Sequence, residues 1–362
     1  MSLQPLRIID ANLNRASEGL RLLEDIARFI LNDAALTQQL KSMRHDLASE
    51  AKSPGIKLLS QRDSEHDIGV TLTLPSPSKG EGLGEGQQDL VGVITANAKR
   101  VAESLRVIEE LAKLPEISPM LNSSKFEQAR FTLYALEKKL ISRVLRQDKI
   151  KQLAGLYVIL DRQALAGRDE LDIASQIIQG GAKVIQLRDK EGSKGELLPV
   201  AQKLKSLCTE SDVLFIINDY LDLALAVDAD GLHIGQGDLP LPIIRRELPL
   251  DKIIGCSVTT VSQASKAQNE GADYIAVGSI FPSVSKEAVT VVGVDTLRQI
   301  RQAVSSPLVA IGGINEDNIG QVIVAGADCV AVIHAVLGKE DAREATQQLM
   351  AKIELAKGEY QS

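Results

Sequence analysis

The chain contains no tryptophan, and only 3% of its 362 residues are aromatic. Nucleic-acid binding proteins usually offer aromatic stacking platforms or a basic surface, whereas the formal net charge here is −7. We therefore expect no nucleic-acid partner. No apolar run approaches the roughly 20 residues of a membrane helix, and the N-terminus lacks the apolar core of a secretory signal. These absences predict a cytoplasmic protein that has no membrane partner.

Cysteine is also scarce. Cys208, Cys256 and Cys329 are far apart and show no CxxC spacing, so neither a disulfide framework nor a zinc site is expected. Each cysteine has apolar neighbours and is interpreted as a small core residue.

The length exceeds what one hydrophobic core usually serves, and the sequence pattern changes near residue 150. Residues 1–150 predict an all-α helical-bundle domain that contains an internal repeat. Five polar residues return 85 positions later: Asn12, Arg15, Glu18, Arg21 and Glu24 become Asn97, Arg100, Glu103, Arg106 and Glu109. A second amphipathic helix follows each copy, which predicts two helical hairpins. The repeated residues share one helix face, which is either a solvated surface or a functional stripe.

A segment at about 71–88 separates the two copies. Its part from Pro75 to Gly86 is rich in glycine, proline and serine. Such composition predicts a flexible surface insertion.

Residues 151–362 alternate short apolar runs with helical segments. The predicted strands are GLYVILD, AKVIQLRD, VLFIIND, GLHIG, IIGCSV, YIAVGSI, PLVAIGGI and CVAVIHAV. Apolar, β-branched runs that are each followed by a helix predict a parallel sheet covered by helices. The regularity favours a closed (β/α)8 TIM barrel, with an open doubly wound sheet as the alternative.

Polar residues gather where the predicted strands end, which is where barrel enzymes place their active sites. Arginine and lysine suit phosphate oxygens. Mg²⁺ takes one or two carboxylates and completes its shell with water and substrate phosphate. Asp219 and Asp238 beside Arg188 and Lys286 therefore predict a Mg²⁺–diphosphate site. The alternatives are a helix N-cap for Asp219 and a turn residue for Asp238.

A second anion site is predicted near the last strands. The glycines of IGGI let backbone N–H groups approach a phosphate, and the loops after strands 7 and 8 of such barrels often form a phosphate cradle. His334 lies at a strand end and is a candidate contact. His233 faces inward, as either a structural or a catalytic residue.

Several motifs together resemble thiamine-phosphate synthase, in order and spacing, over residues 153–345. They are VIQLRDK, IINDYLDLALAVDADGLHIGQGDLP, GCSVTT, YIAVGSIFPSVSK and IGGI. The resemblance implies a Mg²⁺-dependent transferase of thiamine biosynthesis. This family joins hydroxymethylpyrimidine diphosphate to a thiazole phosphate and releases diphosphate.

The resemblance also implies residue roles, with Arg188, Lys286 and Ser257 as the catalytic groups and one Mg²⁺ held by Asp219 and Asp238. The residues implied for the two substrates are Gln186, Leu187, Arg188, Asp189, Lys190, Asn218, Ser257, Ser283, Val284, Ser285, Lys286, Gly313, Ile333 and His334. The sequence departs from the family at His334, where serine is usual, and at PSVSK, where PTxTK is usual.

The N-terminal domain resembles the ThiD2-like helical module through NRASEGLRLLEDIARF, LKSMRHDL and ANAKRVAESLRVIEELAK. This resemblance implies a pyrimidine-phosphate kinase, but no P-loop is present, so an interaction or dimerisation module is the alternative. For the barrel, the alternative is a thiazole tautomerase-like or other phosphate-binding protein. The sequence leaves homo-oligomer formation open.

Overall fold

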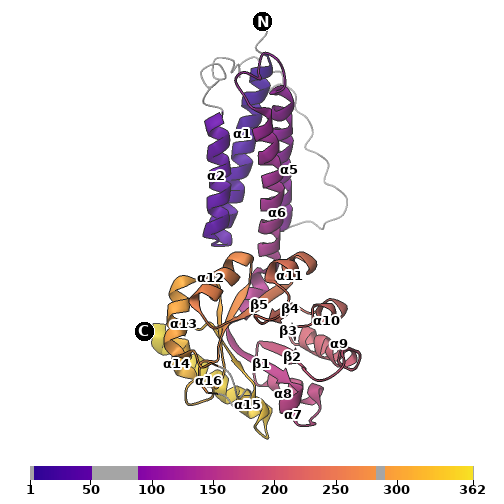
Figure 1. Ribbon diagram of the computed structural model, residues 1–362, viewed down its shortest axis with the longest axis vertical. Coiled ribbons are helices and arrows are strands. Elements are labelled where there is room, and N and C mark those ends of the chain that lie inside the picture. Colours follow the sequence, from indigo (N-terminus) through magenta and orange to yellow (C-terminus); the bar gives the residue numbers. More distant parts are fainter. Residues whose placement is uncertain (1–3, 51–88, 283–289, 362) are drawn as a thin grey trace. The chain divides into compact units, whose positions relative to one another are not determined.

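The computed structural model describes residues 4–50, 89–282 and 290–361. The chain forms two compact units, Met1–Leu145 and Arg146–Ser362 (Figure 1). The division falls five residues before the predicted boundary, because Arg146 and Lys149 already bond to the second unit, at the Leu250 carbonyl and the Asp251 carboxylate. The predicted insertion at 71–88 lies outside the described residues.

The first unit is helical. Its elements are α1 (Gln4–Asp25), the π-helical turn η1 (Ile26–Ile30), α2 (Ala34–Glu50), α5 (Leu90–Leu111) and α6 (Ser123–Gln152). One apolar core joins them. Helices α1 and α5 approach closely at Gly19, where a Cβ atom would lie 2.5 Å from Cγ2 of Val101. The predicted helical bundle is confirmed. None of the described helices is long and apolar enough to cross a membrane.

Two of the repeated polar positions, the asparagine and the last glutamate, make contacts inside this unit. Glu24 is buried and pairs with Arg44 at 2.9 Å. Its repeat equivalent Glu109 is also buried and pairs with Arg130 at 3.1 Å and Arg106 at 2.6 Å. The repeated asparagines donate to the carbonyl four residues earlier, at 2.8 Å in both copies. Each copy thus places a buried glutamate beside an arginine of the following helix.

The second unit is a parallel barrel with helices around it (Figure 1). The barrel is closed, and its strands β1 to β8 are neighbours in chain order. The strands are β1 (Gly155–Asp161), β2 (Val184–Arg188), β3 (Leu214–Asn218), β4 (Gly231–Ile234), β5 (Ile253–Val258), β6 (Tyr274–Val277), β7 (Leu308–Ile311) and β8 (Cys329–Val332). The helices are α7 (Arg162–Leu165), α8 (Glu170–Gln179), α9 (Lys194–Glu210), α10 (Leu221–Ala226), α11 (Leu241–Glu247), α12 (Val261–Glu270), α13 (Gly293–Ala303), α14 (Ile319–Val324), α15 (His334–Leu337) and α16 (Ala342–Gln361). The predicted TIM barrel is confirmed, and the open sheet is excluded.

Side chains alternate between two apolar layers along each strand. One layer lies between strands and helices and contains Val158, Ile185 and Phe215. The other fills the barrel interior and contains Tyr157 and Tyr274. Continuing the alternation along each strand brings the polar residues at the strand ends to the barrel mouth.

Candidate active site at the carboxyl end of the barrel

Two carboxylates lie side by side beyond β3 and β4. The backbone of Asp219 is left-handed, with φ +62°, and its N–H donates to the His233 carbonyl at 2.9 Å. Asp238 accepts from the Gly235 N–H at 2.7 Å. Burial, the negative charge of Asp238 and a hydrogen bond between the two carboxyl groups raise the pKa of Asp219 to about 6. Two like charges held this close favour a shared proton or a bound cation.

The donor set fits Mg²⁺. Among the described residues, no three His, Cys, Asp or Glu side chains gather as ligands. Mg²⁺ needs only one or two carboxylates when substrate phosphate and water complete its shell. Asn218 bonds to Asp219, and the nearby positive charge of Lys190 lowers the pKa of that carboxyl against the larger raising effects. The predicted residues Asn218, Asp219, Asp238 and Lys190 are therefore brought together.

The end of β2 supplies a cation and an amide. Arg188 forms an ion pair with Asp161 at the end of β1, and Asp161 also caps α7 by accepting from the Gln163 N–H at 3.1 Å. Gln186 lies two residues earlier on β2 and is 2% exposed, yet its side-chain nitrogen has no hydrogen-bond partner among the described residues. A buried polar group without a partner is costly, so this amide is suited to a ligand or an ordered water.

Two predicted substrate-binding residues have side chains that are used elsewhere. Leu187 is 1% exposed within the layer between strands and helices, which leaves only its backbone for a substrate. Asp189 accepts from the Glu191 and Gly192 N–H groups, both at 2.9 Å, and pairs with Arg162 at 2.8 Å. Although burial acts in the opposite direction, these contacts together lower the pKa of Asp189. Its side chain shapes the loop after β2.

Ser257 at the end of β5 bonds to His233 of β4, with 2.8 Å between Oγ and Nε2. The other imidazole nitrogen, Nδ1, lies 3.1 Å from the hydroxyl of Tyr274. Burial lowers the pKa of His233 to about 4 despite the nearby Asp238 charge. A serine–histidine pair whose histidine is oriented by a tyrosine rather than a carboxylate lacks the third member of a hydrolase triad.

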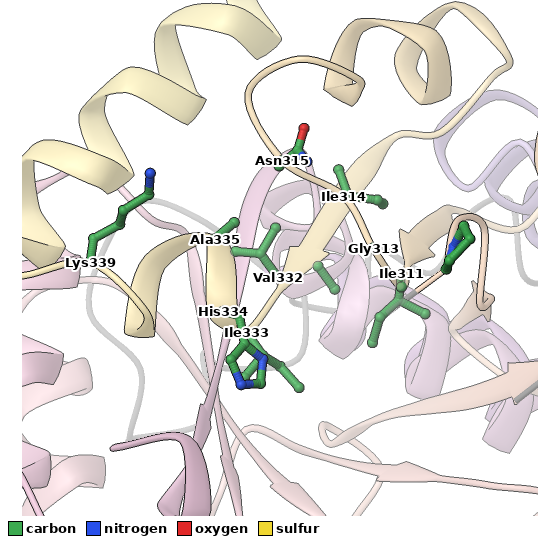
Figure 2. A pocket seen from close by; sticks show the side chains of 12 residues that line it. Ile311, Gly313, Ile314, Asn315, Val332, Ile333, His334, Ala335 and Lys339 are labelled. Carbon is green, nitrogen blue, oxygen red and sulfur yellow. The ribbon is translucent and has the colours of Figure 1, made fainter. Parts of the chain in front are cut away.

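A separate cavity of about 330 Å³ opens after β7 and β8 (Figure 2). The predicted residues Gly313, Ile333 and His334 all line it. Gly312 and Gly313 have φ +100° and +65°, and a Cβ atom on Gly312 would lie 2.0 Å from the Ser279 Oγ. Glycine therefore permits this close packing and leaves backbone groups at the cavity wall.

Two polar lining residues were missed by sequence reasoning. Asn315 follows IGGI directly and could have been found by extending that motif. Lys339 lies two residues after α15, and no local sequence signal marks it. The predicted residues Ser283, Val284, Ser285 and Lys286 lie outside the described residues, although their neighbour Pro282 lines the cavity.

Comparisons with known proteins agree with this geometry. A thiamine-phosphate synthase of Synechocystis sp. is 38% identical over 347 residues, which cover 96% of each chain. Residues 156–336 match the family described as thiamine monophosphate synthase. The chain belongs to the thiamine-phosphate synthase family. A further member, from Thermosynechococcus vestitus, is 37% identical over 96% of this chain and 94% of its own.

The two units match different families. Residues 7–139 match the ThiD2 family, as the sequence resemblance implied. The barrel is similar to the solved thiamine phosphate pyrophosphorylase of Pyrococcus furiosus, which has a TM-score of 0.53 and 40% identity over 57% of this chain and 98% of that one. Membership of the synthase family does not favour the tautomerase-like alternative.

Proposed function

We propose that the barrel condenses 4-amino-2-methyl-5-(diphosphooxymethyl)pyrimidine with thiazole phosphate to give thiamine phosphate and diphosphate. If the thiazole carries a carboxylate, CO2 is also released. The observation that carries the proposal is the Asp219–Asp238 pair at the barrel mouth, where burial and the neighbouring charge of Asp238 raise the pKa of Asp219. Such a pair suits a cation that accompanies diphosphate.

The strand ends divide between the two substrates. The pyrimidine diphosphate would lie over β2 to β5. There Gln186 would offer its side-chain nitrogen, which has no partner within the part of the chain that the structure describes, and Arg188 and Lys190 would face the phosphate oxygens. Lys286 would add a further cation from the loop after β6. The thiazole phosphate would occupy the cavity at Gly313, Ile333 and His334. The family resemblance adds Ser283, Val284 and Ser285 as proposed contacts of this substrate.

The condensation needs charge stabilisation rather than a protein nucleophile. The bond between the pyrimidine methylene and the diphosphate oxygen breaks, and its electron pair leaves with diphosphate. The electron-rich pyrimidine stabilises the positive methylene, which the thiazole nitrogen then captures. Arg188 and the lysines stabilise the negative charge that develops on the leaving group, and the two pockets hold the reactants in register. Bound Mg²⁺, held by Asp219 and Asp238, would supply additional neutralisation of the diphosphate.

Two roles are proposed for the helical unit: it phosphorylates the pyrimidine phosphate, or it serves as an interaction module. Incubating the full chain with ATP and hydroxymethylpyrimidine phosphate distinguishes them. Formation of the pyrimidine diphosphate supports the kinase, and its absence from a preparation that catalyses condensation supports the interaction role.

The deciding experiment for the barrel measures thiamine phosphate formation from the two substrates, with Mg²⁺ and with excess chelator. Wild type should form product only with Mg²⁺. Asp219→Ala should lower kcat/KM by about 10²–10³-fold, the usual size of losing a group that organises transition-state charge.

Asp212→Ala is the matched control. Asp212 is also a left-handed aspartate, with φ +53°, but it precedes β3 instead of following it. This variant should keep wild-type activity. Equal losses of activity in Asp219→Ala and Asp212→Ala, or unchanged product formation in excess chelator, would contradict the metal assignment. Absence of product from folded wild type would contradict the reaction itself.

A further inference from the structure

A continuous row of buried hydrogen bonds runs through the barrel interior to Ser257. Tyr157 Oη lies 3.1 Å from Tyr274 Oη, and Tyr274 Oη lies 3.1 Å from His233 Nδ1. His233 Nε2 lies 2.8 Å from Ser257 Oγ. The first three residues are buried, whereas Ser257 is partly exposed at the barrel mouth. The row therefore connects the floor of the barrel with the site.

The barrel is built to accommodate this row. The His233 imidazole stacks on the Tyr274 ring, with centroids 5.7 Å apart and planes at 26°. Gly255 lies beneath that ring, and a Cβ atom there would stand 2.0 Å from Cζ of Tyr274. The backbone carbonyl of Ser257 is held separately by the Gln236 amide at 2.7 Å. Packing thus fixes each member in place.

Counting donors fixes the direction of the row. Within the described residues, the only hydrogen-bond partner of the Tyr157 hydroxyl is Tyr274. If Ser257 donated inward, the Tyr157 proton would point into the apolar interior without an acceptor, and a buried donor left unpaired is unfavourable. If Tyr157 donates instead, every proton in the row has an acceptor up to Ser257.

We propose that Tyr157, Tyr274 and His233 are positioning residues that orient the Ser257 hydroxyl as a hydrogen-bond donor toward an anionic oxygen at the barrel mouth. Tyr157 donates to Tyr274, Tyr274 donates to Nδ1 of His233, and Nε2–H of His233 donates to Ser257 Oγ. The Ser257 proton then points outward. The identity of the acceptor rests on the proposed function, under which it is an oxygen of the departing diphosphate.

The first test observes the imidazole directly in the full chain. Two-bond ¹H–¹⁵N correlation spectra of protein labelled with ¹⁵N-histidine distinguish the two neutral tautomers. The signal that disappears in His233→Gln should show a protonated Nε2 and a bare Nδ1. A protonated Nδ1 would overturn the proposal. This result does not depend on catalysis, so it holds even if the protein forms no thiamine phosphate.

The second test uses kinetics. Ser257→Ala should lower kcat by about 30–100-fold with KM nearly unchanged, because the donor acts on charge that develops in the transition state. Tyr274→Phe keeps the ring but removes the donor to Nδ1, so it should lower kcat roughly tenfold. The double variant should match Ser257→Ala alone, because the tyrosine acts only through the serine.

Tyr134→Phe is the control, because Tyr134 is an exposed tyrosine of the helical unit, and its activity should equal that of wild type. If the losses in kcat of Ser257→Ala and Tyr274→Phe multiply in the double variant, Tyr274 acts through packing alone and the proposed positioning of Ser257 is overturned. Failure of wild type to form product would instead contradict the proposed function. The tautomer of His233 would then decide whether the row of hydrogen bonds has the proposed direction.

Discussion

Carboxylates of the helical core and of the barrel mouth differ in the sign of the charge beside them. In the helical unit, buried glutamates face arginines: Glu24 pairs with Arg44, and Glu109 pairs with Arg130 and Arg106. At the barrel mouth, Asp219 faces Asp238, a group of the same sign. An opposite-charge pair satisfies itself within the fold, whereas a like-charge pair favours a bound proton or cation beyond the partial compensation that Lys190 gives here. The sign of the neighbouring charge thus separates the structural glutamate clusters of the helical unit from the candidate site, independently of any sequence motif.

Among the ion-pair variants, the largest effect is expected for Arg188→Gln. Loss of its charge beside the proposed leaving group should lower kcat/KM by about 10²-fold. The matched control is Arg301→Gln, which breaks a similar ion pair with Asp328, at 3.0 Å, before β8 at the opposite end of the barrel. That variant should retain activity. Steady-state assays measure kcat/KM of both variants. Equal losses in Arg188→Gln and Arg301→Gln would show that Arg188 acts only through folding.

The helical unit should respond in stability and not in condensation. Arg44→Met leaves the buried Glu24 without its cation and should cost about 2–4 kcal/mol in the free energy of unfolding. Arg130→Met should cost less, because Glu109 retains Arg106 at 2.6 Å and Lys113 at 3.7 Å. Urea unfolding followed by circular dichroism is suitable, since the chain has no tryptophan. Equal losses of unfolding free energy in Arg44→Met and Arg130→Met would refute the inferred difference between the two copies of the repeat.

A smaller effect tests the like-charge pair through pH. Folding raises the pKa of Asp219 from 3.8 to about 6, so its contribution to stability is full below pH 3.8 and is lost as pH rises through 6. In metal-free protein, Asp219→Asn should therefore be more stable than wild type by about 1–2 kcal/mol at pH 7.5, a figure reduced for partial exposure. Asparagine also tolerates the left-handed backbone.

That gain should disappear near pH 3, where the wild-type carboxyl is protonated in both the folded and the unfolded state. Thermal unfolding at the two pH values in chelator is the measurement. A gain of the same size at both pH values would mean that charge is not its cause.

The sequence predicted the barrel because its local signals agree with the fold. The apolar runs predicted at 155–161 and 253–258 have the same limits as β1 and β5. The last strand was predicted too long. CVAVIHAV is apolar almost throughout, but the chain bends at Ile333, with φ −118° and ψ −81°, and continues as α15. An apolar run does not show where tertiary packing ends a strand.

The site was predictable where it depends on strand ends, since parallel strands bring those residues to one mouth. The alternation that directs Gln186 and Arg188 inward also directs Leu187 outward, so the burial of that side chain could have been inferred. The row from Tyr157 to Ser257 could not. It joins tyrosines 117 positions apart and depends on Gly255 leaving space for a ring. Lys339 likewise reaches the cavity only through the fold.

The most direct test of the central claim is titration calorimetry of the full chain with diphosphate, in the presence and absence of Mg²⁺. We expect Mg²⁺ to strengthen diphosphate binding to wild type at least tenfold. This dependence should be lost in Asp219→Ala and Asp238→Ala and retained in Arg44→Met. Diphosphate binding that is independent of Mg²⁺, or a dependence that survives in both aspartate variants, would contradict the claim that the like-charge pair is a metal–diphosphate site.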